Sequence, residues 1–240
     1  MMLNTLSIME LHVHTLKLDL DWKLIQAMSS IDRFDASWSS IERQEGQSLK
    51  QLKTIATIRS VGASTRIEGS RMSDDEVSVL LKNIDITQLD DRDSQEVVGY
   101  FEVLDLIADA FAEIRINQSS IRNLHKVLLK YSTKDEWHRG NYKQHSNAVE
   151  AVFPDGNKHI IFRKTEPVYP TTDAMASLVK WYRKDAETHP LVKSALFAYE
   201  FVSIHPFQDG NGRLSRLLTT LLLLQNQYRW IQYVSLEHEI

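Results

Sequence analysis

The stretch IHPFQDGNGRLSRLL, residues Ile204–Leu218, lies between two of the most apolar segments of the chain. Its residues 205–216 contain one histidine, one acid, two glycines, one asparagine and two arginines. Pro206 disfavours helical geometry at the residue before it, so we expect the preceding helix to end near Ile204. A final, nearly all-apolar helix is expected over 212–225. A polar segment of this density between two buried helices indicates a binding loop.

The residue types in this loop suit an anion. Gly210 and Gly212 allow the backbone N–H groups to point inward, and Asn211 tolerates the same conformations. These N–H groups belong to the N-terminus of a helix, where the helix dipole also favours negative charge. Arg213 and Arg216 are three residues apart on nearly one face, which suits the extra charge of a polyphosphate.

Two further side chains indicate the chemistry. Asp209 is better explained as a ligand of Mg²⁺ bridging phosphates than as a direct ligand of an anion. His205 can act as a general base near neutral pH. Together these residues suggest nucleophilic attack on a phosphate of a nucleoside triphosphate. A calcium loop is excluded because Arg213 occupies a position that needs an oxygen ligand, and a dinucleotide fingerprint is excluded because the third glycine is missing.

The rest of the chain is predicted to be mainly helical. Only 8 glycines and 5 prolines interrupt it, which favours long helices over many short strands. Apolar periodicity and capping residues predict helices over 20–44, 49–67 with a stop at Gly69, 74–81 after a Ser73–Glu76 capping box, 95–114, from Ser119 or Ser120 to Leu128, from Thr171 or Thr172 to Arg183, and from His189–Pro190 to Ile204. Residues 148–163 break the helical pattern and predict one hairpin with a turn at 154–157.

Composition narrows the class of protein. The chain has 240 residues, of which 42% are hydrophobic and 25% charged, as in ordinary globular proteins. A net charge of −4 implies no general attraction to nucleic acid or to anionic lipid. Zero cysteines exclude disulfides and thiolate metal sites. The N-terminal residues lack a signal-peptide pattern, and the longest apolar run is far short of the ~20 residues that span a bilayer. We expect a cytoplasmic protein that binds no membrane.

Residues 205–216, HPFQDGNGRLSR, resemble the signature of the Fic family, HxFx[D/E]GNGRxxR, at every fixed position. The resemblance implies a mainly α fold in which a Fic-type helical core over 95–240 carries one β-hairpin flap. Residues 1–94 would form an N-terminal helical extension, and the acidic segment NIDITQLDDRDS would link the two parts.

The resemblance also implies a reaction, the transfer of AMP from ATP to a Ser, Thr or Tyr hydroxyl of a protein, with release of pyrophosphate. His205 would deprotonate the hydroxyl, Asp209 would bind Mg²⁺ on the α- and β-phosphates, and Phe207 would anchor the loop. The residues that would bind the ATP phosphates are Gly210, Asn211, Gly212, Arg213 and Arg216.

The resemblance assigns two further regions more loosely. The family's flap, which pairs with an extended target segment, corresponds in position to Lys158, His159, Ile160, Ile161 and Phe162. A hairpin that only covers the core is an equally open interpretation. Tyr233 corresponds in position to an adenine contact, but it could equally be a core residue.

A second motif is Ser64-Thr65-Arg66-Ile67-Glu68-Gly69. Ser64 and Glu68 are four residues apart and share one helix face, as in an ordinary helix that ends at a glycine. The stretch also matches the family's inhibitory motif, [S/T]xxxE[G/N], at Ser64, Glu68 and Gly69. The resemblance implies that the helix over about 50–69 is inhibitory, because Glu68 would pair with Arg216 and occupy the site of the ATP γ-phosphate.

Several alternatives stay open. The same site could remove AMP from targets, with Glu68 positioning a water, and some family branches transfer phosphate, UMP or phosphocholine. Gly212 argues against the kinase-like branch. A non-catalytic ATP-binding scaffold is the alternative to an enzyme. The protein substrate could be the chain itself, and a homodimer is expected because helical N-terminal extensions often pair. Longer relatives carry a C-terminal winged helix where this chain stops, and we expect no nucleic-acid binding from the segment present.

Overall fold

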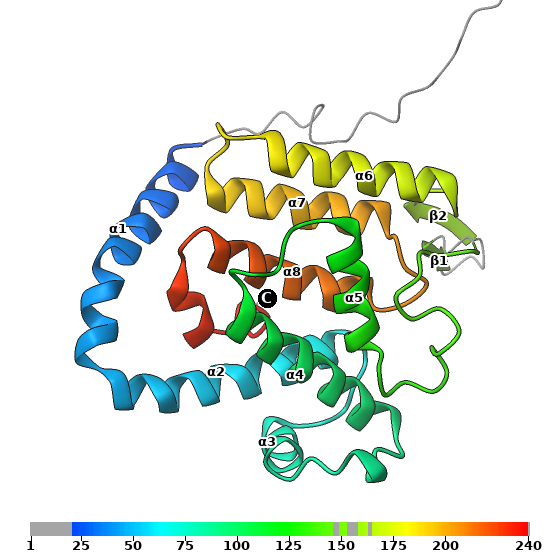
Figure 1. Ribbon diagram of the computed structural model, residues 1–240, viewed down its shortest axis with the longest axis horizontal. Coiled ribbons are helices and arrows are strands. Elements are labelled where there is room, and N and C mark those ends of the chain that lie inside the picture. Colours follow the sequence, from blue (N-terminus) through cyan, green and yellow to red (C-terminus); the bar gives the residue numbers. More distant parts are fainter. Residues whose placement is uncertain (1–20, 146–148, 153–157, 163–164, 240) are drawn as a thin grey trace, which may run out of the picture.

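The computed structural model describes residues 21–145, 149–152, 158–162 and 165–239. These residues form eight α-helices, two strands and two short 3₁₀ helices (Figure 1). The α-helices are α1 Trp22–Gln44, α2 Gly46–Ile67, α3 Asp74–Lys82, α4 Arg92–Ala110, α5 Gln118–Leu128, α6 Tyr169–Lys184, α7 Pro190–Ile204 and α8 Asn211–Gln225. The 3₁₀ helices are η2 Ile86–Gln88 and η3 Arg229–Tyr233. The mainly helical class expected from the sequence is confirmed.

Helix α8 lies at the centre of the fold, surrounded by α4, α5, α7 and η3 (Figure 1). Its fully buried apolar side chains are Leu214, Leu217, Leu218, Leu221, Leu222 and Leu224. Burial of each leucine contributes roughly 1.5–3 kcal/mol of transfer free energy, and leucines around most of the helix circumference leave it few orientations. The loop that precedes α8 is therefore attached to the most firmly packed helix of the core.

Local signals placed several helix ends correctly. The predicted capping box of α3 is present, with Ser73 Oγ accepting the Glu76 N–H and Glu76 accepting the Ser73 N–H. Helix α2 ends just before Gly69, whose φ is +101°. Helix α7 begins at Pro190, with His189 as its N-cap, and ends at Ile204.

Two predicted N-caps are wrong. The N-cap of α5 is Asn117, whose Oδ1 accepts the Ser120 N–H at 2.8 Å, so neither Ser119 nor Ser120 has that role. Helix α6 begins at Tyr169 and has no side-chain cap. Thr171 and Thr172 lie inside its first turn and donate their hydroxyls to the carbonyls of Glu166 and Val168. An N-cap residue lies just before the first helical residue, so these two threonines, the third and fourth residues of α6, are too far into the helix for that role.

Two helix boundaries also differ from the prediction. Helix α4 ends at Ala110, four residues before the predicted end. Gln225 of α8 donates to the carbonyl oxygens of Phe111 at 2.8 Å and Ile114 at 2.6 Å. These long-range bonds hold the residues that follow the helix and satisfy carbonyls that have no partner within it. Within the predicted linker, residues 83–94, the chain already forms η2 and the first turn of α4, which starts at Arg92.

The two strands are β1 Val149–Val152 and β2 Lys158–Phe162. They pair antiparallel, with Val152 opposite Lys158, and an irregularity in the register falls between Val149 and Glu150. The predicted turn at 154–157 lies outside the described residues. The role of the strand pair as a flap stays a prediction.

Helix α1, predicted over 20–44 from a periodic stripe of apolar residues, buries little of that stripe. Of the apolar stripe expected on this helix, only Trp38 is buried, and Trp22 is 70% exposed. Figure 1 shows α1 and α2 meeting at an angle, with α1 at the periphery and α2 running towards α4, against which it packs. Helix α2 contributes Val61 to the central cluster, and the division of the chain into residues 1–94 and 95–240 stays a prediction. Among the described residues, no helix is long and apolar enough to cross a membrane.

Candidate functional site

The loop between α7 and α8 is held by its own side chains. Phe207 is fully buried, as expected for an anchor. Its backbone N–H donates to Asn211 Oδ1 at 2.9 Å, and Asn211 Nδ2 donates back to the Phe207 carbonyl at 2.8 Å. Gly210, with φ of +78°, then turns the chain into α8. This reciprocal pair makes the loop compact enough to present several N–H groups together.

His125 of α5 supports the loop from below. Its ring stacks on Phe207 with centroids 3.7 Å apart. The Gly140 N–H donates to Nδ1 at 2.9 Å, so Nε2 carries the proton and donates to the Asp209 carbonyl at 3.0 Å. The contact spans 84 residues of sequence, and no local pattern in α5 distinguishes this histidine from an ordinary core residue.

The protonation of His125 should make the fold sensitive to acid. Burial lowers the pKa of its imidazole from 6.5 to about 4, despite the Asp209 carbonyl nearby. Because the unfolded chain binds the proton first, the stability is intact above pH 6.5 and falls towards pH 4, by about 3 kcal/mol in total. Urea unfolding at pH 7 and pH 4.5 should show a smaller loss for His125→Gln than for the wild type. An equal loss in both proteins would contradict this assignment.

Asp209 lies at the mouth of the loop. Its Oδ1 accepts the Gly210 N–H at 2.6 Å and an N–H of Arg213 at 3.2 Å, and its Oδ2 lies 3.4 Å from Lys134 Nζ. Burial alone would raise the pKa of this carboxyl group, but Arg213, Lys134 and the Gly210 N–H together lower it below 3.8. Asp209 is therefore a carboxylate at neutral pH, as a magnesium ligand must be.

The described residues contain no group of three or more acidic or histidine side chains that could hold a metal alone. Magnesium in nucleotide sites commonly uses one or two carboxylates and takes its other ligands from phosphates and water. A single ionised Asp209 beside a phosphate-binding loop fits that pattern. The site therefore suits a Mg²⁺ ion that binds together with a nucleotide, whose phosphates would supply further ligands.

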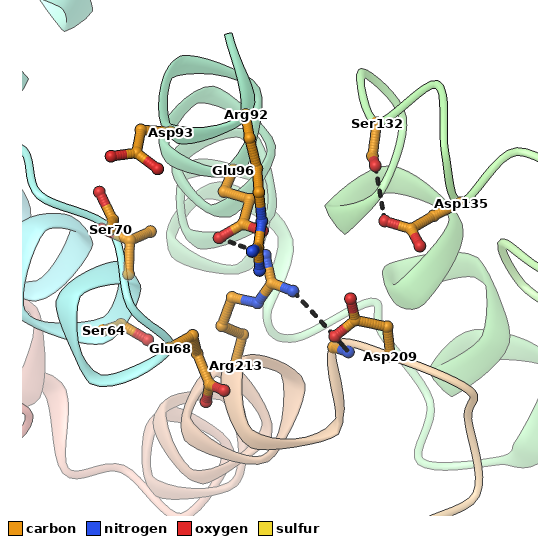
Figure 2. Close-up of polar contacts among 12 residues, drawn as sticks. Ser64, Glu68, Ser70, Arg92, Asp93, Glu96, Ser132, Asp135, Asp209 and Arg213 are labelled. Atoms are coloured by element: carbon orange, nitrogen blue, oxygen red, sulfur yellow. Dashed lines mark hydrogen bonds and ion pairs between the residues drawn. The ribbon is translucent and has the colours of Figure 1, made fainter. Parts of the chain in front are cut away.

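Arg213 is fixed from both sides by carboxylates. Its side chain is 1% exposed, with Nη1 3.2 Å from Glu96 Oε2 and Nη2 3.2 Å from Asp209 Oδ1. Glu96 is itself paired with Arg92, at 2.6 Å. Figure 2 shows this series of alternating charges running from α4 to the loop. This series of charges fixes the position of the Asp209 side chain. Glu96 could not be predicted from the sequence, because nothing in α4 distinguishes it from a surface acid.

Arg216 is bound to the C-terminal end of α2. Its Nε donates to Ser64 Oγ at 2.7 Å, and its Nη2 donates to the Ser64 carbonyl at 3.0 Å and to Glu68 Oε1 at 2.8 Å. Glu68 also lies directly over Gly212, where a Cβ would be only 2.3 Å from its Oε1. The structure thus brings Ser64 and Glu68, from a distant part of the sequence, to the start of α8.

The remaining predicted residues are placed as follows. His205 is the C-cap of α7, in the left-handed region with φ of +52° and ψ of +62°. Residues Lys158–Phe162 form β2. Tyr233 ends η3 and packs on Trp38 of α1, with ring centroids 5.1 Å apart. Ser64 and Glu68 of the α2 motif contact Arg216, while the role of His205 and the adenine contact suggested for Tyr233 stay predictions.

Comparisons with known proteins agree with this arrangement. The model of the Fic/DOC family matches residues 115–223. The Drosophila melanogaster protein adenylyltransferase Fic is 27% identical over 207 residues, which cover 84% of this chain and 39% of the relative. This chain thus spans about two fifths of the curated relatives it matches.

Two crystal structures have a similar fold. A Fic domain containing signaling protein from Bacteroides thetaiotaomicron superposes with a TM-score of 0.66 at 26% identity, covering 83% of this chain and 72% of that one. A Fic family protein from Desulfovibrio desulfuricans superposes with a TM-score of 0.68 at 26% identity, covering 89% of this chain and 62% of that one. The likeness extends N-terminal to the matched domain, since 83% and 89% of the chain are more than all residues from 115 onwards.

Proposed function

Since this chain carries a domain of the Fic/DOC family, we propose that it is an autoinhibited protein adenylyltransferase, which transfers AMP from ATP to Ser, Thr or Tyr hydroxyls of target proteins. The observation that carries the proposal is the anion-binding loop at the start of α8 with Arg216 bound to Glu68. The loop would bind the polyphosphate of the nucleotide. The carboxylate of Glu68 in that site would regulate the transfer.

The phosphates would lie on the N–H groups of Gly210–Gly212. Arg213 and Arg216 would bind the β- and γ-phosphates, and Asp209 would hold Mg²⁺, which would neutralise phosphate charge. Two features support this assignment: the surroundings of Asp209 lower the pKa of its carboxyl group, and Arg213 Nε is buried without an acceptor in the described part of the chain. A buried donor without a partner is costly, and a phosphate oxygen would satisfy it.

His205 would act as the general base. It would take the proton of the target hydroxyl, whose oxygen attacks the α-phosphorus. One P–O bond forms to the target, the bond between the α- and β-phosphates breaks, and pyrophosphate leaves. The described residues of the loop offer no hydroxyl or thiol nucleophile of their own, which favours direct transfer to a target. Strand β2 would dock an extended segment of that target through main-chain hydrogen bonds.

Glu68 would block this reaction by occupying the position of the γ-phosphate. Its side chain is bound to Arg216 and is 32% exposed. A charge-assisted hydrogen bond contributes about 1.5–3 kcal/mol, and each 1.4 kcal/mol corresponds to about tenfold, so Glu68→Gly is expected to raise auto-modification roughly 10- to 100-fold. The measurement is protein-bound label from ATP labelled at the α-phosphate, with wild type and variant side by side.

A matched control is Glu76→Gly. Glu76 is an acidic residue of the next helix, α3, and its carboxylate accepts from Ser73 instead of contacting the loop. This variant should modify itself at the wild-type rate. No increase in Glu68→Gly over this control would sink the inhibitory role of Glu68.

Removal of AMP is the second candidate, and the position of Glu68 favours it. A carboxylate that lies over Gly212 beside the loop could position a water for attack on a bound AMP ester. A pre-modified target incubated with wild type and with Glu68→Gly separates the two activities. Loss of label in the presence of wild type only would favour removal, whereas ATP binding without either activity would favour a scaffold.

A further inference from the structure

The backbone of His205 occupies a conformation that needs support. A φ of +52° and a ψ of +62° fall in the left-handed region, which residues other than glycine seldom adopt. Such a conformation persists only where the surrounding contacts fix it, and it often marks a functional site. The contacts that fix it here are made to the carbonyl of the residue before His205 and to the carbonyl of the residue after it.

The first of these contacts is to the carbonyl of Ile204. Its oxygen accepts the hydroxyl of Thr165 at 2.6 Å and Nζ of Lys143 at 3.2 Å. The second is to the carbonyl of Pro206, which accepts the backbone N–H of Lys143 at 2.8 Å. Lys143 is 1% exposed, so its bonds form away from bulk water and are stronger for it. The backbone is thereby held on both sides of His205, at the carbonyls of Ile204 and Pro206.

Lys143 and Thr165 come from the two segments that flank the strand pair. Lys143 precedes β1, and Thr165 follows β2. The Val168 N–H, at 3.4 Å from the Lys143 carbonyl, joins the two segments to each other. The segment before the strand pair and the segment after it thus both contact the backbone next to the histidine.

We infer that Thr165 and Lys143 are positioning residues for His205, which hold its backbone so that the imidazole is aimed at the reacting hydroxyl. The inference rests on the proposed function, because His205 needs an aim only if it acts as a base. It also links the proposed docking strand to the base, because Lys143 precedes β1 and Thr165 follows β2. Neither residue would contact ATP.

The test uses Thr165, because it is only partly buried and valine matches its shape. In the Glu68→Gly background, Thr165→Val removes the hydroxyl donor, and Thr165→Ser keeps it. Thr172→Val is the matched control, since the Thr172 hydroxyl donates to Val168 on the exposed side of α6. The readouts are kcat for AMP transfer, and the Kd for ATP measured by calorimetry on each variant.

We expect Thr165→Val to lower kcat about 10-fold or more, because small misplacements of a catalytic group cost up to about 100-fold. The Kd for ATP should not change, and Thr165→Ser and Thr172→Val should retain the parent rate. A Thr165→Val rate equal to the parent overturns the inference, as does a weaker Kd for ATP in proportion to the loss of rate. If Glu68→Gly itself transfers no AMP, the proposed function fails first.

Discussion

Replacing Glu96 with alanine is expected to lower the free energy of unfolding by about 3–5 kcal/mol, the usual cost of removing one partner from a buried ion pair. The reason is that Arg213, 1% exposed and 3.2 Å from Glu96, cannot turn to water when its partner is removed. Figure 2 shows Glu96 between the guanidinium groups of Arg92 and Arg213. Urea denaturation of both proteins at pH 7 measures the difference.

The control is the other partner of Glu96. The side chain of Arg92 is 56% exposed, and exposed ion pairs contribute about 0–1 kcal/mol, so Arg92→Ala should have a small effect. If Glu96→Ala were no more destabilising than Arg92→Ala, the buried charge of Arg213 would not depend on Glu96. That result would contradict the interpretation that Glu96 positions Asp209 through Arg213.

Replacing His205 with alanine is expected to reduce AMP transfer by about 100- to 10,000-fold, the usual range for loss of a general base. The Glu68→Gly background is required, because the wild-type rate of AMP transfer is expected to be too low for a further decrease to be measured. The initial rate of label incorporated from ATP labelled at the α-phosphate measures the effect. Affinity for ATP should stay within about 2-fold, since a base contributes to the transition state and not to ground-state binding.

A second histidine on the same helix provides the control. His189 is the N-cap of α7, where Nδ1 accepts the Leu191 N–H and Nε2 contacts Asp32. His189→Ala should leave the rate of transfer close to that of the parent. A His205→Ala variant as active as His189→Ala would contradict the role of His205 as the base.

Those parts of the fold that depend on neighbouring residues could be predicted from the sequence. The ends of α7 follow from Pro190 and Pro206, and the start of α3 follows from Ser73 and Glu76. Other helix ends were predicted wrongly. Gln225 of α8 binds the carbonyls that follow the early end of α4, a contact that no local pattern shows. The cap of α6 was misplaced within the local sequence, because the helix starts at Tyr169 and already contains Thr171.

The candidate site divides in the same way. Its loop is one continuous motif, so His205, Asp209 and the glycines could be named in advance, and the pairing of Arg216 with Glu68 was implied by the family resemblance. The groups that support the loop could not be named. His125 stacks on Phe207 from α5, and Thr165 reaches Ile204 across 39 residues. Contacts of this kind are set by how the helices pack, which the periodicity of one helix does not specify.

The central claim is that the group transferred is AMP, and parallel incubations of Glu68→Gly with two labelled forms of ATP test it most directly. One form carries the label on the α-phosphate and the other on the γ-phosphate. If AMP is transferred, only the α-label becomes protein-bound, and the γ-label is released as pyrophosphate. Protein-bound γ-label, or no bound label although ATP binds, would contradict adenylyl transfer.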